Sequence, residues 1–319
     1  MLFRQLEYFV AVARERHFAR AAKACFVSQP ALSASIAKLE SELGVTLINR
    51  GRSFEGLTAE GERLVVWARR ILAEKDGFRA ELAAVQSGIT GTLRLGVEPT
   101  ASTTLALPVA AFCAAHPLAR VSVESRLSET ELRRRLCDFE LDVAIAQFDP
   151  DDASGLNVVR LYEERYVVVA SDDRLLPRGP AVSWTDIAQL PLALLTPDMR
   201  IRQVIDKAFA ECGIELNPHI ETDSVASLYA LVGAGSCVTI VPQTWLHALP
   251  VIGTTRIARL INPDVRAQIS VAINSTTPGS MAARAFVSAA KGLAFNDFLD
   301  RPRMTSTASL DSPWLSSSH

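Results

Sequence analysis

The chain has 319 residues, of which 49% are hydrophobic and 21% are charged, and its formal net charge is -2. This composition excludes a disordered or membrane-embedded chain and is typical of a soluble globular protein with two or three domains. Residues 1–70 hold 11 basic and 7 acidic side chains, so the remainder of the chain is acidic. A basic N-terminal part on an acidic body favours a nucleic-acid partner.

Targeting and metal-binding signals are missing from the sequence. Arg4 and Glu7 interrupt the N-terminal apolar residues, and the apolar run 105–115 is too short to span a bilayer, so we expect a cytoplasmic protein without a membrane partner. Neither the cysteines nor the histidines have the spacing of metal ligands. We therefore expect five buried, reduced thiols, with a redox sensor as the alternative, and no metal or cofactor.

Two short helices are predicted at the N-terminus. The first is amphipathic, with an apolar face formed by Leu6, Phe9, Val10 and Ala13. In residues 18–24, alanines recur at helical spacing, which would let another helix pack at close range. We expect Phe18 and Phe26 to bracket this small-residue surface.

A longer helix is predicted between Ser28 and Gly44. Ser28 is the expected N-cap, Pro30 falls in the first turn, and Gly44 is the expected C-terminal cap. The apolar residues lie on one stripe, at Leu32, Ile36, Leu39 and Leu43. Together with the preceding helix, this pattern predicts a helix-turn-helix.

The opposite face of this helix is polar and carries the predicted DNA contacts. Such a helix can lie in the major groove, where Gln can read adenine and Ser can donate or accept. An ordinary solvated helix face is the alternative interpretation. The candidate DNA-binding residues on this helix are Ser28, Gln29, Pro30, Ser33, Ser35 and Lys38.

A wing is predicted after Gly44. Residues 45–50 form a short strand-like run, and residues 51–56 form a loop. Arg50 and Arg52 would contact phosphates, which fix the register of a protein on DNA without reading its sequence. Solvated loop arginines are the alternative.

A long helix is predicted from its N-cap, Thr58, to about Gln86, followed by a hinge over residues 87–91. Its apolar side chains are Leu64, Trp67, Ile71, Phe78, Leu82 and Val85. The simplest partner for this stripe is the same helix of a second copy, which would present two DNA-reading helices to a palindrome. Packing against the rest of its own chain is the alternative.

The order of these features resembles the LysR family of bacterial transcription regulators. The SQPALS motif of that family occurs at residues 28–33. Further matching positions are Ile36, Leu39, Glu40, Leu43, Gly44, Leu47 and Arg50. Ala34 stands where many members have Arg, so one possible base or phosphate contact is absent.

Beyond residue 91, strands and helices alternate, which predicts an α/β region with a parallel sheet. The first series has strands at 93–97, 121–125 and 141–146 and helices at 106–116 and 129–139. The second series has strands at 161–170, 192–195 and 237–241 and helices at 201–212 and 224–233. Two such series predict two lobes with a cleft between them.

Residues 92–296 resemble the family's effector domain, whose fold is similar to that of periplasmic binding proteins. The resemblance implies a small effector between the lobes, held by hydroxyls and helix-start amides at Thr100, Ser102, Thr103, Glu129, Thr130, Thr196, Pro197, Asp198 and Arg200. Amides at helix starts favour an anionic or carbonyl ligand. Arg200 and Arg202 agree with that ligand, whereas Asp198 opposes a strongly anionic one. For each of these side chains, a role in capping a helix or on the surface is the alternative. Phe139 replaces the family's usual glycine and is expected to alter the end of its helix.

The resulting fold class is α/β with an N-terminal winged helix-turn-helix. The expected domains are 1–58 for DNA binding, 59–91 for the linker or dimerisation helix and hinge, 92–296 for the effector, and 297–319 as a disordered tail. No GxSxG, Walker A or HExxH motif occurs, so no enzyme is predicted.

The resemblance implies a homodimer or homotetramer that binds a promoter palindrome in double-stranded DNA under the control of a small molecule. One alternative is an effector-independent DNA-binding regulator. The other is a small-molecule binding module whose N-terminal helices serve dimerisation only.

Overall fold

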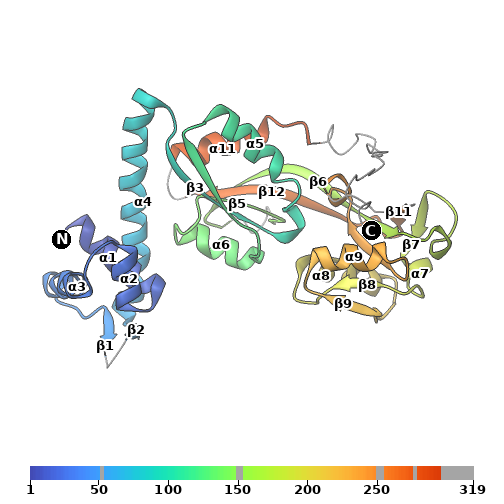
Figure 1. The fold of residues 1–319 in the computed structure, drawn as a ribbon, viewed down its shortest axis with the longest axis horizontal. Helices are drawn as coiled ribbons and strands as arrows, with labels where there is room; N and C mark the ends of the chain where they lie inside the picture. Colours follow the sequence, from blue (N-terminus) through green and yellow to red (C-terminus); the bar gives the residue numbers. More distant parts are fainter. Residues whose placement is uncertain (51–53, 149–153, 249–254, 276–278, 296–319) are drawn as a thin grey trace, which may run out of the picture.

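The computed structural model describes residues 1–50, 54–148, 154–248, 255–275 and 279–295. An N-terminal helical unit leads into one long helix, which is followed by two α/β lobes (Figure 1). The predicted tail, residues 297–319, lies outside the described residues. None of the described helices is both long enough and apolar enough to cross a membrane.

The N-terminal unit consists of three helices and a two-stranded wing. Its elements are α1 (Phe3–Glu15), α2 (Phe18–Ala24), α3 (Gln29–Leu43), β1 (Ile48–Arg50) and β2 (Phe54–Leu57). The two wing strands pair antiparallel, and the second begins inside the segment predicted as a loop. The helix-turn-helix and the wing are therefore present as predicted, with a shorter wing loop.

The core of this unit follows the apolar stripes of its helices. Leu32, Ile36 and Leu39 of α3 are fully buried, whereas Leu43 at the helix end is exposed, so its predicted burial is wrong. Phe18 packs against the core. The prediction for Phe26 is also wrong, because its side chain is 96% exposed and brackets nothing.

The long helix α4 (Ala59–Ser87) starts at the predicted cap, since the Thr58 Oγ1 accepts a hydrogen bond of 3.0 Å from the Gly61 amide. Its first half packs on the N-terminal core through Leu64, Val65, Ala68 and Ile71. Trp67, Phe78 and Leu82 remain 58%, 63% and 57% exposed, respectively. The side chain of Val85 is not among those described.

The first lobe has a sheet between two helical layers (Figure 1). Its strands are β3 (Gly91–Val97), β4 (Ala119–Glu124), β5 (Val143–Ala146) and β12 (Arg266–Asn274). The helices α5 (Ala106–Ala115) and α11 (Met281–Lys291) pack on one face through Phe112 and Phe286, and α6 (Glu129–Cys137) packs on the other through Leu132 and Leu136. A short helix, η1 (Pro99–Ala101), follows β3.

The second lobe surrounds a larger apolar core that includes Trp184, Phe209 and Trp245. Its strands are β7 (Ala181–Ser183), β8 (Ala193–Leu195), β9 (Ile220–Thr222), β10 (Val238–Pro242) and β11 (Arg256–Ile261). Its helices are η3 (Asp173–Leu175), α7 (Trp184–Ile187), α8 (Arg200–Glu211), α9 (Val225–Gly233) and α10 (Trp245–Ala248).

One strand, β6 (Leu156–Ala170), runs through both lobes. Its first part pairs antiparallel with β12 over residues 156–165, and its last part pairs antiparallel with β10 and β11 over residues 166–170. The prediction of a parallel sheet is therefore correct for β3, β4 and β5 but wrong for the strands that join the lobes. The predicted strand 161–170 captured only part of β6.

Candidate DNA-binding face and effector site

The polar face of α3 points away from the core of the N-terminal unit. Ser28 caps the helix, because its Oγ accepts a bond of 3.4 Å from the Ala31 amide. Gln29, Pro30 and Lys38 are exposed, as is Ser28. Ser33 and Ser35 are half-buried at the borders of this face. The predicted residues thus share one accessible surface that could enter a major groove.

Glu40, which was not among the predicted DNA-binding residues, holds the wing against α3. Its Oε1 accepts hydrogen bonds of 2.9 Å from the Leu47 amide and 3.3 Å from the Ile48 amide. These two bonds fix the start of β1 relative to the recognition helix. Arg50 ends β1, but its side chain is not among those described, and Arg52 lies outside the described residues.

An exposed apolar surface lies along α4. A hollow of about 790 Å³ is lined by Phe3, Trp67, Arg70, Ile71, Glu74, Lys75, Phe78 and Arg79. The Arg70 guanidinium lies over the Trp67 ring at 5.4 Å from the ring centre, and the Lys75 ammonium lies 5.6 Å from the Phe3 ring centre. Exposed aromatic surface of this extent on a helix marks a protein interface.

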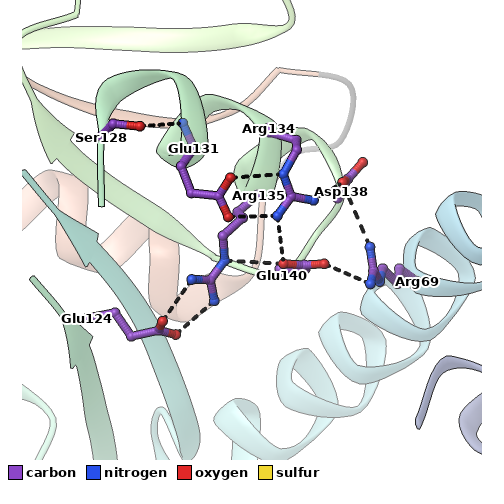
Figure 2. Close-up of polar contacts among 8 residues, drawn as sticks. All are labelled: Arg69, Glu124, Ser128, Glu131, Arg134, Arg135, Asp138 and Glu140. Atoms are coloured by element: carbon purple, nitrogen blue, oxygen red, sulfur yellow. Dashed lines mark hydrogen bonds and ion pairs between the residues drawn. The ribbon is translucent and has the colours of Figure 1, made fainter. Parts of the chain in front are cut away.

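The linker helix is joined to the first lobe by ion pairs at the end of α6 (Figure 2). The Arg69 guanidinium lies 2.7 Å from Glu140 and 3.8 Å from Asp138. Arg134 and Arg135 bind the same Glu140 carboxylate at 3.6 Å and 3.2 Å. This cluster, which we call the α4–α6 corner, joins the linker helix to the first lobe through charged side chains.

Phe139 lies within the α4–α6 corner and has a left-handed backbone, with φ of 57°. The helix ends in a Schellman motif, since the Phe139 amide donates to Leu136 O and the Glu140 amide donates to Arg135 O. Glycine is usual at this position, and the phenyl ring instead lines a pocket of about 570 Å³ together with Leu72 and Ala73 of α4. The expected alteration of the helix end by Phe139 is therefore wrong, because the backbone keeps the motif.

Glu98, at the carboxyl end of β3, is the charged residue that the effector-site prediction missed. It is 1% exposed, its Oε2 accepts a bond of 2.9 Å from the Gln147 amide, and its Oε1 has no hydrogen-bond partner among the described residues. Burial raises the pKa of Glu98, while the Gln147 hydrogen bond and the charge of Arg200 act to lower it. The signal in the sequence is an acid directly after the buried strand β3.

The predicted effector residues follow the carboxyl ends of β3, β4 and β8, where ligands of α/β proteins bind. The charge of Arg200 in the second lobe acts to lower the pKa of Glu98, and the charge of Glu129 in the first lobe acts to raise it. Buried hydroxyls of Thr103 and Thr196 have no hydrogen-bond partner among the described residues. Pro197 and Asp198 are exposed, as is Arg200.

Several predicted effector residues already have structural partners. The Thr100 carbonyl accepts a bond of 2.9 Å from the Trp245 indole, which ties η1 to the second lobe. The Ser102 hydroxyl donates to Pro99 O, and Glu129 pairs with Arg133 at 2.8 Å. Thr130 is exposed on the first turn of α6.

Arg202 does not support an anionic ligand, contrary to the prediction. Its guanidinium is buried and donates to Leu195 O, while ion pairs join it to Asp206 and Glu221. Its charge is therefore compensated inside the second lobe.

A buried carboxylate stabilises the crossing of β6 between the lobes. Glu164 accepts hydrogen bonds from the Thr244 hydroxyl at 2.5 Å and from the Thr244 amide at 3.3 Å. Burial raises the pKa of Glu164 to about 7, although these hydrogen bonds act to lower it. The group therefore titrates near neutral pH at the junction of the lobes.

In the described part of the chain, no group of three or more His, Cys, Asp or Glu side chains could hold a metal ion. All five cysteines are free thiols. Only Cys237 is fully buried, so the expectation of five buried thiols is too strong. Burial raises the pKa of Cys25, Cys137 and Cys237, which favours the unreactive thiol form.

A winged helix-turn-helix joined by a long helix to a two-lobed α/β domain is the architecture of a ligand-responsive DNA-binding regulator. Residues 3–62 match the family model described as "Bacterial regulatory helix-turn-helix protein, lysR family", and residues 86–294 match "LysR substrate binding domain". The chain therefore belongs to the LysR family of DNA-binding transcriptional regulators.

Individual relatives agree with this assignment. The DNA-binding transcriptional dual regulator OxyR of Escherichia coli is 30% identical over 242 residues, covering 76% of this chain and 79% of the relative. The regulator YybE of Bacillus subtilis is 29% identical over 245 residues, covering 76% of this chain and 83% of YybE. The relatives are regulators rather than enzymes.

Solved structures of the family share the fold over nearly the whole chain. Full-length CbnR in complex with its target DNA has a TM-score of 0.63 and 26% identity, covering 91% of this chain and 99% of CbnR. A full-length OxyR variant from Pseudomonas aeruginosa has a TM-score of 0.74 and 23% identity, covering 92% of this chain and 96% of the OxyR variant. The partners of this family are DNA, small-molecule effectors and further copies of the chain itself.

Proposed function

We propose that this chain is a homo-oligomeric regulator that reads a palindromic promoter site, and that a small molecule bound between its lobes modulates this binding. The observation that carries the proposal is the orientation of α3, whose residues Leu32, Ile36 and Leu39 are buried while Gln29 and Lys38 remain exposed. Two copies joined along α4 would present two such helices to one DNA site. The protein would act in the cytoplasm, on chromosomal DNA.

The effector site that we propose lies around Glu98 and Arg200. Glu98 would accept a hydrogen bond from a donor group of the ligand, and Arg200 with the amides at the start of α8 would bind an anionic or carbonyl group. The buried hydroxyls of Thr103 and Thr196 offer two further polar contacts. We therefore propose a small polar effector that carries both a donor and an acceptor group.

Peroxide sensing is the role that the names of several relatives suggest. The relatives include the "Hydrogen peroxide-inducible genes activator" of Dickeya chrysanthemi, at 32% identity over 246 residues. In this chain, burial raises the pKa of three thiols, which slows their reaction with a peroxide. We therefore propose a small molecule bound between the lobes, rather than peroxide, as the signal.

The experiment that tests the proposal is a DNA selection with the purified full-length chain. The wild-type protein should enrich a symmetric duplex from a random-sequence pool, and Gln29→Ala should lose this enrichment while keeping its oligomeric state. Glu98→Gln should keep the same DNA preference but lose the response to compounds that raise the thermal midpoint of the wild type. Equal enrichment by Gln29→Ala would contradict the proposed role of α3.

A further inference from the structure

The exposed residue Phe26 stands between the two helices of the helix-turn-helix. The α2 helix ends in a Schellman motif, because the Phe26 amide donates to Lys23 O at 3.2 Å and the Val27 amide donates to Ala22 O at 3.0 Å. Phe26 is the left-handed residue of this motif, with φ of 55°. A phenylalanine is strained in this conformation, which glycine adopts without penalty.

Two other helices in the same chain end in the same motif, and they show which residues occupy its left-handed position. At the end of α8 the equivalent left-handed residue is Gly213, with φ of 71° and the same pair of hydrogen bonds. At the end of α6 it is Phe139, which is half-buried and lines the same pocket as Leu72 and Ala73 of the linker helix. Phe26 has the strain of Phe139 without a comparable contact, because its side chain is 96% exposed.

The position of Phe26 indicates which surface would cover it. Ser28, the N-cap of α3, and Gln29, its first residue, follow Phe26 by two and three residues, and all three are exposed. In helix-turn-helix complexes the first helix crosses the DNA backbone and the start of the second enters the major groove, so the turn between them lies at the groove edge. The exposed Lys23 beside this turn suits the negative charge of phosphates.

We propose that Phe26 is a DNA contact, whose ring packs against apolar surface at the edge of the major groove next to the bases read from Gln29 onward. The apolar groups available there are the thymine methyl and the edge of a deoxyribose. This inference rests on the proposed reading of DNA by α3. It adds a large apolar side chain to a surface on which Gln29 and Lys38 are exposed.

The test compares Phe26→Gly and Phe26→Leu with the wild type, using the duplex that the wild-type protein selects from a random pool. Phe26→Gly relieves the backbone strain, so its thermal midpoint should equal or exceed that of the wild type. Its affinity for the selected duplex should fall by about tenfold, which corresponds to about 1.4 kcal/mol, and Phe26→Leu should lose less. The opposite directions of the two effects separate a DNA contact from a folding role.

Leu118→Ala is the control, because Leu118 is another exposed apolar residue, 60% exposed, that lies on the first lobe and is remote from α3 in the sequence. It should leave the affinity unchanged. Replacing the thymines of the duplex by uracil, one at a time, distinguishes the two contacts. If one replacement lowers the affinity of the wild type but not that of Phe26→Gly, Phe26 contacts that thymine methyl. If no replacement has this effect, Phe26 contacts a deoxyribose.

Three results would overturn the inference. Binding of the selected duplex by Phe26→Gly within twofold of the wild type would exclude the contact. A changed oligomeric state in light scattering with unchanged DNA affinity would assign Phe26 to a second copy of the chain. Failure of the wild-type protein to select any duplex would instead remove the proposed function itself.

Discussion

At the residue scale, Glu164 should govern how the stability of the lobe junction depends on pH. Its pKa is about 7 in the folded protein, against an ordinary value of 4.5. Between these values the folded state keeps a proton that the unfolded chain has released, so the stabilisation present below pH 4.5 is lost as the pH rises to about 7. Glu164→Gln should therefore flatten the dependence of the free energy of unfolding on pH.

Urea unfolding at several pH values across this window measures that slope. Glu163→Gln is a suitable control, because the neighbouring carboxylate is half exposed and pairs with Arg266 at the surface. It should retain most of the slope of the wild type. A Glu164→Gln variant with an undiminished slope would show that another group titrates at the junction.

Two glycines of the same helix provide a matched test of close packing. A Cβ at Gly61 would clash with the Leu47 carbonyl, whereas a Cβ at Gly77 would meet nothing. Gly61→Ala should therefore destabilise the chain by about 1–3 kcal/mol. Gly77→Ala should stabilise α4 by up to about 1 kcal/mol, because alanine loses less backbone entropy. Thermal unfolding of both variants checks the expectation, and similar midpoints would contradict it.

At the element scale, the helices of the N-terminal unit could be predicted because their signals are local. Ser28 and Gly44 bound α3, and its buried residues Leu32, Ile36 and Leu39 recur at helical spacing. The strands β7, β9, β11 and β12 and the helix α11 were not predicted. In β6 and β12, pairing depends on residues more than 100 positions apart, which no local pattern specifies. Glu98 was missed for the same reason, since its hydrogen-bond partner, the Gln147 amide, lies 49 positions further along the chain.

The α4–α6 corner makes a prediction about how elements are held together. Arg69→Glu places a carboxylate beside Glu140 and Asp138, so repulsion should separate the first lobe from the linker helix. Distances between spin labels on α4 and α6 should lengthen and broaden. The additional change Glu140→Arg should partly restore them. Arg63→Glu, an exposed position on the same helix, is the control and should change nothing.

At the scale of the whole molecule, the exposed apolar residues of α4 predict an assembly of copies. Phe78 and Leu82 lie one helical turn apart and are more than half exposed, so a second α4 would bury both. Phe78→Glu should reduce the oligomer to smaller species in light scattering. Because a monomer presents only one α3, its affinity for a symmetric site should fall at least tenfold. An unchanged molar mass would show that α4 is not the interface.

The central claim is that α3 reads DNA sequence and that a ligand between the lobes alters this reading. The most direct measurement is the selection of duplexes from a random pool by the purified protein, repeated at raised salt. We predict one symmetric sequence, with half-sites about 10 base pairs or a multiple apart, that persists at raised salt. Binding that is equally strong to all sequences and disappears with salt would contradict the claim, because it would reflect phosphate contacts alone.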